Sequence, residues 1–329
     1  MILILSRQDD GSSRQVAEWL YAMKKKFIRL NADDQKNCLL GCDVPIGSFS
    51  IMINNKRYTF SIEVVKSVWH RRRGFSKGYP FYAPNRLDNL FHGTSPYAEK
   101  HLKEEATEMI EYLYHKLETN SGIHNIGSQA HNTVNKLIVL EIANSCGLKV
   151  PESFIISTKK DLMFLLKKEK KLVTKAIGNG IYRFTNEFGY YSYTEKINKP
   201  FIDSLPGTFF PSMVQKQIHK QYELRIFFLE KKFYSMAIFS QETAATTIDN
   251  RKNFEADCMP RCVPYLLPDK IKKKLSLLMW ELKLNTGSID MIVTDSNEYY
   301  FLEVNPVGQF GMVSQPCNYY LEKKIAESL

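Results

Sequence analysis

The stretch that most constrains the fold is Gly287 to Phe310, GSIDMIVTDSNEYYFLEVNPVGQF. Ser288 to Thr294 alternates and is rich in β-branched residues, and Tyr299 to Val304 has the same character. Between them, Asp295-Ser296-Asn297 is a cluster of turn-forming residues. The pattern therefore predicts a β-hairpin.

Three oxygen-bearing side chains lie on this hairpin. Asp290 on the first strand can face Glu303 on the second, and Glu303 and Asn305, two residues apart, point to the same face. Two carboxylates and an amide in one place favour a hard cation between them, and Mg²⁺ takes such oxygen ligands. We therefore predict a magnesium site at Asp290, Glu303 and Asn305. The alternative is an exposed hairpin with solvated acids.

Length and composition indicate a globular protein of two or three domains. The chain has 329 residues, 44% hydrophobic and 24% charged, which is too long for one ordinary core. No run approaches the roughly 18 apolar residues that span a bilayer. The start, MILILSRQDD, lacks the basic segment and the cleavage site of a signal peptide. We expect a cytoplasmic protein with no membrane partner.

The six cysteines are scattered along the chain without a CxxC pair. A disulfide framework is therefore not expected. Cys38 and Cys42, like Cys258 and Cys262, are spaced as Cys-x3-Cys, but no histidine or further cysteine completes a familiar zinc pattern. We expect free thiols.

The net charge of +10 indicates an acidic partner. A basic protein of this kind binds nucleic acid, a nucleotide or an acidic peptide. The sequence contains neither zinc-finger spacing nor an aromatic ribonucleoprotein motif. We expect no nucleic-acid partner, and a non-catalytic basic nucleic-acid-binding protein remains the alternative from another class.

The rest of the chain mixes strands and helices. Apolar periodicity predicts strands at 2–5, 27–30, 50–53, 57–62, 64–69, 153–156, 171–177, 181–193, 212–218, 224–229 and 233–239, and helices at 12–25, 96–118, 133–146, 159–168, 268–284 and 318–328. Residues 240 to 268 form a long irregular stretch, and loops of that length are usually functional or disordered.

Two loops suggest a binding cleft. His70-Arg71-Arg72-Arg73 follows a strand, where arginines reach into the cleft of open α/β sheets or lie solvated in a loop. Gly178-Asn179-Gly180 is not GxGxxG, and no helix follows it, so a Rossmann fingerprint is excluded. That loop either covers phosphates or is a simple hairpin turn.

Four features then follow one another in a fixed order. They are Lys136 on a helix, Lys175 at a strand end, a strand from Gln215 that leads to Glu223-Leu224-Arg225, and the acidic hairpin. This order resembles the ATP-grasp superfamily. The pieces NKLIVLEIANSCGLKVPESFII, QKQIHKQYELRIFF and the hairpin itself carry most of the resemblance.

A narrower resemblance comes from short motifs outside these pieces. SRQDDGSS, RLNADD, VWHRRRGF, the loop DNRK…MPRCVPYLLP and the tail NPVGQFGMVSQPCNYYLEKKIA resemble the peptide-modifying branch, which contains the microviridin-type (graspetide) ligases. The tail is most similar to their grasp-with-spasm peptide maturase group.

The resemblance implies a mixed α/β and α+β ATP-grasp fold. We expect an N-terminal pre-ATP-grasp (Rossmann-like) domain at 1–120, a small central ATP-grasp subdomain at 121–205, and a C-terminal subdomain with the metal site at 206–329. The two subdomains would clamp ATP with two Mg²⁺ ions.

The resemblance also implies roles for single residues. Lys136 and Lys175 would neutralise the triphosphate, Glu223 would bind the ribose, and the adenine edge would be read by a hinge strand of Gln215, Lys216, Gln217 and Ile218. Arg225 adjoins an apolar strand and needs an anionic partner. By resemblance it faces the transferred phosphoryl group, and Arg251 holds the acyl phosphate or the accepting carboxylate.

The implied activity is ATP-dependent activation of a carboxylate. In the graspetide branch, Glu or Asp side chains of a ribosomal precursor peptide are phosphorylated and joined to Thr or Ser as esters, or to Lys as amides. Arg72, Arg73 and Arg261 are our candidates for contacts to an acidic core peptide. We also expect a homodimer. A ligase that adds a free amino acid to a protein or small molecule is the first alternative.

Overall fold

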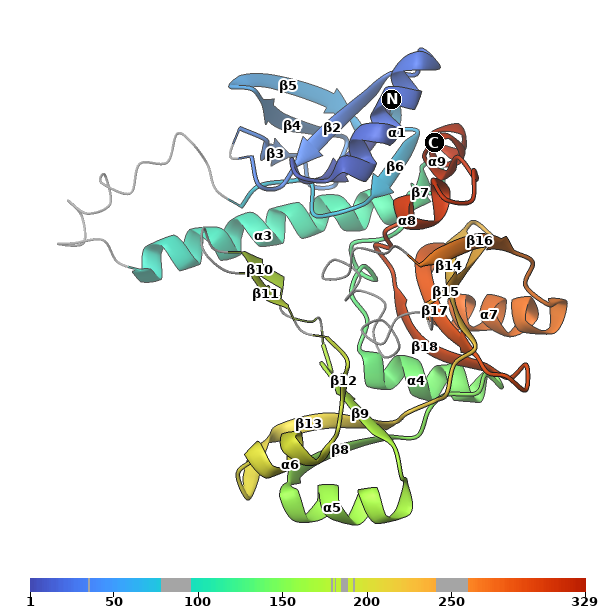
Figure 1. Cartoon of the computed structure of the whole chain (residues 1–329). Coiled ribbons are helices and arrows are strands. Elements are labelled where there is room, and N and C mark those ends of the chain that lie inside the picture. Colours follow the sequence, from blue (N-terminus) through green and yellow to red (C-terminus); the bar gives the residue numbers. More distant parts are fainter. Residues whose placement is uncertain are drawn as a thin grey trace.

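A computed structural model of the chain describes residues 1–34, 36–77, 96–178, 180, 182–184, 189–191, 193–240 and 260–329. Figure 1 shows a first unit that holds both chain termini, a second unit at the opposite end of the molecule, and a third unit between them. Within the described residues, no helix is both long and apolar enough to cross a membrane.

The first unit is built on a parallel sheet with strand order β2-β1-β6-β7. Its elements are β1 (Ile2–Ser6), α1 (Gly11–Ala22), β2 (Phe27–Asn31), β6 (Ser67–His70), α3 (Pro96–Thr119) and β7 (His124–Ile126). The continuous apolar run of β1 reflects burial of both its faces. Ile4 packs in the cluster that includes α1, whereas Leu5 packs in the cluster that includes α3. The predicted β-α-β opening is confirmed.

A small antiparallel sheet, β3-β4-β5, completes the first unit. Its strands are β3 (Cys38–Cys42), β4 (Ser48–Ile53) and β5 (Lys56–Ser61), and a short 3-10 helix, η1 (Ile62–Val64), follows them. The predicted strands at 50–53 and 57–62 are confirmed, and they pair as the hairpin of β4 and β5, with Asn54 and Asn55 at positive φ in its turn. Strand β3 was missed because its sequence, CLLGC, is short and contains glycine. The described cysteines are all free thiols.

The second unit is an antiparallel sheet with strand order β12-β9-β13-β8. Its elements are β8 (Ser153–Thr158), α5 (Lys159–Lys168), β9 (Leu172–Lys175), β12 (Glu195–Lys196), α6 (Lys199–Ser204) and β13 (Thr208–Lys216), beside the hairpin β10 (Tyr182–Phe184) and β11 (Gly189–Tyr191). Helix α5 has the predicted bounds, because Thr158 caps its start by accepting a hydrogen bond from Asp161 N.

The third unit is an antiparallel sheet with strand order β16-β15-β14-β17-β18. Its elements are α4 (Lys136–Ser145), β14 (Tyr222–Leu229), β15 (Lys232–Phe239), β16 (Arg261–Tyr265), α7 (Asp269–Glu281), β17 (Thr286–Val293) and β18 (Tyr299–Asn305). Leu140 of α4 and Leu278 of α7 share a buried cluster with Ile289 of β17, so both helices belong to this unit's core. The prediction of an irregular stretch at 240–268 is wrong at 261–265, where β16 pairs with β15, and residues 241–259 lie outside the described residues.

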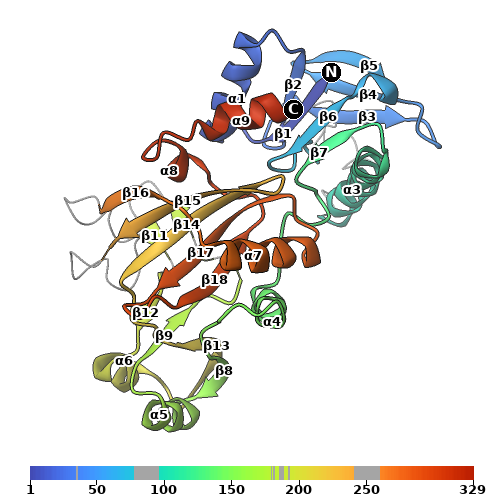
Figure 2. The same ribbon diagram turned by 90° about the vertical axis from the view of Figure 1, so that its right-hand side faces the viewer.

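The end of the chain returns to the first unit. Helix α8 (Gly311–Ser314) is followed by α9 (Leu321–Ser328), and α9 lies beside α1 in Figures 1 and 2. Lys25 Nζ donates to the carbonyl of Ala326 at 2.9 Å, and Ser67 Oγ donates to that of Leu329 at 2.7 Å. These bonds fasten the C-terminal end of the chain to the first unit.

The three units divide the chain at residues other than the predicted limits. Strand β7 lies in the first sheet although it follows residue 120, and β13 lies in the second sheet although it follows residue 205. The division into 1–120, 121–205 and 206–329 therefore stays a proposal about domains, and the described sheets favour later boundaries.

Candidate active site

Two carboxylates face each other across the last hairpin. Asp290 on β17 and Glu303 on β18 are direct partners in the ladder, and Asn305 pairs with Ser288. The register shifts between Asp290 and Met291, and such bulges re-aim side chains. The predicted hairpin and the facing of its two carboxylates are thus confirmed.

Each of these carboxylates has a cationic partner. Arg225 lies opposite Asp290 in the β14–β17 ladder and donates from Nη1 to Asp290 Oδ2. Lys136, the first residue of α4, places its Nζ 3.1 Å from Glu303 Oε2 and donates to the carbonyl of Ala176 at 3.0 Å. The anionic partner that the sequence requires for Arg225 is therefore Asp290.

The two carboxyl groups differ in their affinity for protons. Burial, together with the nearby Glu303, raises the pKa of Asp290 although Arg225 acts against this rise. Burial opposes ionisation of Glu303 as well, but Lys136, Lys175 and Arg225 together lower the pKa of that carboxyl. The hairpin thus presents Glu303, whose ionised form is favoured by three cations, beside Asp290, whose ionised form is opposed mainly by burial.

Lys175 adds a positive charge from the second unit to the surroundings of Glu303. It is the last residue of β9, and its positive charge is among the causes that lower the pKa of Glu303. Lys136 comes from α4, which packs with the third unit. The structure therefore gathers Lys136, Lys175, Arg225, Asp290 and Glu303, which are five of the predicted site residues, around one end of the β17–β18 hairpin.

Glu223 continues this row of charges along β14. Its Oε1 accepts hydrogen bonds from Lys220 Nζ and, at 2.8 Å, from Ser240 Oγ. Lys220 is only 4% exposed, so its charge is neutralised inside the protein by Glu223. The sequence did not single out Lys220, which stands in a run of polar residues and gives no sign of burial.

The predicted hinge strand is shorter than expected. β13 ends at Lys216, so Gln217 and Ile218 lie in the connection from the second unit to β14. Gln215 is buried and donates to Ser153 Oγ at 2.8 Å, whereas Lys216 is ion-paired with Glu169 at 2.9 Å. Gln217 has a buried side-chain oxygen without a hydrogen-bond partner in the described part of the chain.

The remaining candidates lie on other elements. Arg72 is partly exposed, with its Nε 3.8 Å from Asp10 Oδ2, and Arg73 is exposed. Arg261 begins β16 and lies exposed over the Phe239 ring, 5.2 Å from its centre. Arg251 lies outside the described residues.

Among the described residues, the fully buried arginine is Arg71, which is not one of the predicted site residues. It is 2% exposed, and its Nε donates to Asp10 Oδ2 at 2.8 Å. Asp10 also caps α1 by accepting from Ser12 N at 3.1 Å. The sequence offered a signal only for Asp10, which precedes Gly11-Ser12-Ser13 at a predicted helix start. Three consecutive arginines cannot be told apart by pattern.

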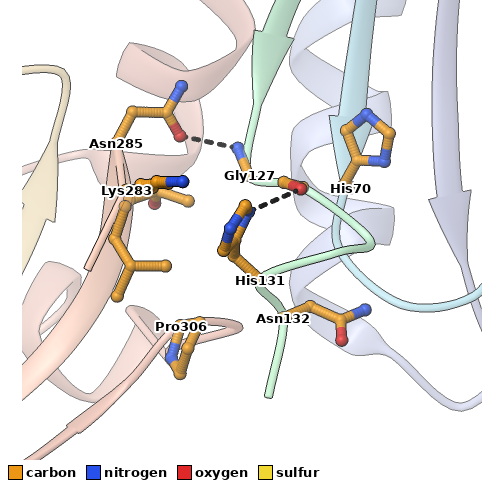
Figure 3. Close-up of a pocket in the computed structure, with 10 residues that line it drawn as sticks. His70, Gly127, His131, Asn132, Lys283, Asn285 and Pro306 are labelled. Atoms are coloured by element: carbon orange, nitrogen blue, oxygen red, sulfur yellow. Dashed lines mark hydrogen bonds between the residues drawn. The ribbon is translucent and has the colours of Figure 1, made fainter. Parts of the chain in front are cut away.

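A small pocket lies between the first and third units, next to the β17–β18 hairpin (Figure 3). It is lined by residues such as His70, His131, Asn285 and Pro306. Asn285 Oδ1 accepts from Gly127 N at 2.8 Å across the junction. Pro306 directly follows Asn305, so the pocket borders the turn that leaves β18.

The oxygen donors present fit a magnesium ion. Asp290 and Glu303 supply two facing carboxylates, and Asn305 supplies an amide oxygen from the same strand end. Within the described residues, no group of three or more His, Cys, Asp or Glu could hold a metal ion, so a site here depends on the amide as its third donor. Hard oxygen donors of this kind suit Mg²⁺, whose remaining positions are filled by water and phosphate.

Solved structures with the same fold include peptide-modifying ligases. The RiPP-associated ATP-grasp ligase of Chryseobacterium gregarium, in complex with ADP and a leader and core peptide, is 24% identical, with a TM-score of 0.76 over 99% of this chain and 94% of that one. The macrocyclase MdnC from Microcystis aeruginosa, bound to its precursor peptide MdnA, is 26% identical, with a TM-score of 0.74 over 99% of this chain and 98% of that one.

A third similar structure contains magnesium. The ATP-grasp ligase PsnB, complexed with a minimal precursor, Mg and ADP, is 14% identical, with a TM-score of 0.69 over 99% of this chain and 95% of that one. No protein-family model matches the chain, and no curated protein matches it.

These comparisons define the class. The fold is that of the ATP-grasp ligases, so the predicted fold is confirmed. The predicted resemblance to peptide-modifying ATP-grasp ligases is also confirmed, because the similar structures are a RiPP-associated ATP-grasp ligase, a macrocyclase and a further ATP-grasp ligase, each in complex with a precursor or with leader and core peptides. The predicted cofactors, ATP and Mg²⁺, agree with the ADP and Mg that these structures hold.

Proposed function

We propose that the protein is an ATP-dependent peptide macrocyclase that joins side chains of a ribosomally made precursor peptide. The observation that supports this proposal most directly is the cluster of charges at the hairpin. Asp290 faces Glu303, Arg225 is ion-paired with Asp290, and Lys136 is ion-paired with Glu303. Such a cluster suits a triphosphate with its magnesium. Phosphoryl transfer needs positioning and neutralised charge more than covalent help from the enzyme.

In this proposal the nucleotide lies between the second and third units. Lys136 and Lys175 bind the phosphates, and Glu223 binds the ribose hydroxyls. The connection after β13 receives the adenine, where the buried oxygen of Gln217 has no hydrogen-bond partner among the described residues. An exocyclic amine is a suitable donor for such an oxygen.

Asp290, Glu303 and Asn305 would hold magnesium, which when bound neutralises charge on the transferred phosphoryl group. A Glu or Asp carboxylate of the peptide attacks the γ-phosphorus, ADP leaves, and Arg225 stabilises the charge on the transferred group. Arg251 holds the acyl phosphate or the accepting carboxylate. A Thr or Ser hydroxyl, or a Lys amine, then attacks the acyl carbon, loses its proton, and displaces inorganic phosphate. Each bond formed removes one water from the peptide and consumes one ATP.

The peptide is the part of the proposal that rests most on the comparisons. Similar structures hold leader and core peptides, and this chain carries a net charge of +10 that would attract an acidic core. We propose Arg72, Arg73 and Arg261 as contacts to that core. We further propose a homodimer, located in the cytoplasm, where ATP and newly made precursor are available.

Mass spectrometry tests the proposal. The protein is incubated with Mg·ATP, a mixture of free amino acids, and a short precursor peptide consisting of a leader and a core rich in Thr and Glu or Asp. A peptide that loses one water for each ADP released supports macrocyclisation. A peptide that gains the mass of an added amino acid would instead identify a ligase for free amino acids, and an unchanged peptide would contradict both activities.

A further inference from the structure

A buried arginine joins the first unit to the turn that follows β18. Arg71 extends from the end of β6, and its Nη1 donates to the carbonyl oxygens of Val307 and Gly308. Its guanidinium also lies 5.6 Å from the centre of the Phe310 ring. Arg71 and this turn are 236 residues apart in sequence. One side chain of the first unit therefore holds two consecutive backbone carbonyls of the third.

The position of Arg71 is fixed from the other side by Asp10. A guanidinium that is 2% exposed would be costly without partners. Asp10 Oδ2 neutralises it, while Asp10 Oδ1 accepts hydrogen bonds from the start of α1. The arginine is thus held between a helix cap and the turn, and it has little freedom to move relative to either.

The turn that Arg71 holds also binds the side chain of Asn305, which is the last residue of β18. Gly308 N donates to Asn305 Oδ1 at 3.2 Å. Gly308 has a φ of +39°, and a Cβ added there would lie 2.6 Å from Ser288 N. Only glycine therefore fits, and the backbone that bonds to Asn305 passes close against β17. A shift of the turn would move Asn305.

We propose that Arg71 is a positioning residue for the magnesium site. By binding the carbonyls of Val307 and Gly308, it fixes the turn whose N–H orients Asn305. This inference rests on the proposed function, in which Asn305 is a magnesium ligand. If so, a residue of the first unit positions the proposed metal site of the third unit, and Arg71 acts without touching the substrate.

The test measures how the nucleotide depends on magnesium, apart from turnover. ADP binding to the whole protein is measured by calorimetry across a series of Mg²⁺ concentrations, for the wild type and for Arg71→Lys. Lysine keeps the charge but cannot bridge two carbonyls and Asp10. Arg71→Lys should raise the Mg²⁺ concentration for half-maximal ADP binding by about tenfold to a hundredfold, the range typical of lost outer partners of metal ligands. Binding of ADP without Mg²⁺ should stay unchanged.

The matched control is Arg7→Lys, which changes an arginine of the same unit whose side chain is 52% exposed. It should leave the Mg²⁺ requirement unchanged. If Arg71→Lys does not fold, Asp10→Asn keeps the size of the capping residue and should raise the Mg²⁺ requirement in the same direction. In folded variants, an unshifted Mg²⁺ requirement with only a lower melting temperature would overturn the inference and leave the proposed function standing. A wild type whose ADP binding does not respond to Mg²⁺ would overturn both.

Discussion

Asp290 lies directly opposite Glu303, and a cation from a different element is paired with each: Arg225 of β14 with the first and Lys136 of α4 with the second. Four charges that alternate in sign are thus held at one end of a hairpin. Because α4, β14 and β18 share one core, this arrangement is built into the third unit. It would supply the neutralised charge that the proposed phosphoryl transfer needs.

Loss of two of the proposed metal ligands should remove activity without unfolding the protein. Glu303→Gln together with Asn305→Ala leaves the hairpin's apolar contacts in place, but it replaces one carboxylate by a neutral amide and removes the amide oxygen of residue 305. A bound metal ion stabilises the transition state of phosphoryl transfer by several kcal/mol. Loss of the metal should therefore slow ADP release by more than about a hundredfold. ADP release and the melting temperature are measured together.

The control for this double variant is Glu298→Gln, in the turn of the same hairpin, where Glu298 is ion-paired with Lys149. It should retain ADP release. Normal ADP release in the Glu303/Asn305 variant would contradict the metal assignment.

Lys136→Met should weaken nucleotide binding. The methionine keeps the length of the side chain but removes the charge that lies 3.1 Å from Glu303 Oε2. Hydrogen bonds to charged groups contribute about 1.5–3 kcal/mol, so ADP affinity should fall by roughly tenfold to a hundredfold. Calorimetric titration with Mg·ADP measures this. Lys149→Met removes an exposed lysine of the same protein and should bind as the wild type does; equal affinities in the two variants would refute the role of Lys136.

Gly308→Ala should disturb the turn next to Asn305. Its added Cβ would lie 2.6 Å from Ser288 N, and its φ of +39° is unfavourable for alanine. We expect a loss of about 1–3 kcal/mol in the free energy of unfolding, together with slower ADP release. Urea unfolding and ADP release provide the measurement. The control is Gly311→Ala, three residues further on, where an added Cβ would have no atom within 4 Å. If Gly308→Ala were as stable and as active as Gly311→Ala, the turn would have room for a Cβ and the prediction would be wrong.

Stability should fall on acidification through His70. The imidazole is buried, and burial lowers its pKa, although the hydrogen bond with Asn125 and the charge of Glu118 act in the opposite direction. In the unfolded chain the His70 imidazole has a pKa of about 6.5. It therefore binds a proton more readily in the unfolded chain than in the folded protein. This contribution is complete above about pH 6.5 and is lost as pH falls toward the folded pKa.

Urea unfolding at about pH 7.5 and about pH 5.5 measures the effect, which we expect to reach about 1 kcal/mol. His70→Gln, which cannot titrate, should lose less stability between the two pH values. His115→Gln, at an exposed position of α3, should match the wild type. An equal loss in wild type and His70→Gln would exclude His70 as the cause.

The parts that the sequence predicted well depend on local pattern. Helix α5 has a capping threonine before it and lysines in its last turn, and the β17–β18 hairpin has a turn cluster between two alternating strands. Both signals lie within a few neighbouring residues. Asp290 could therefore be placed opposite Glu303 without knowledge of the rest of the fold.

The parts that were missed depend on distant residues. Arg71 rather than Arg72 or Arg73 is buried because its partners, Asp10 and the 307–308 carbonyls, come from other elements. Strand β16 exists because β15 offers it an edge, not because of its own sequence, RCVPY. No local pattern contains that information.

The central claim is that a carboxylate of a peptide is activated by ATP. A precursor peptide carrying oxygen-18 in its Glu and Asp side-chain carboxylates tests it most directly. The protein is incubated with this peptide and Mg·ATP, and the released inorganic phosphate is analysed by mass spectrometry. Our account predicts one labelled oxygen in phosphate for each water lost from the peptide, because the displaced phosphate keeps the carboxylate oxygen that attacked ATP. Cyclised peptide accompanied by unlabelled phosphate would contradict it.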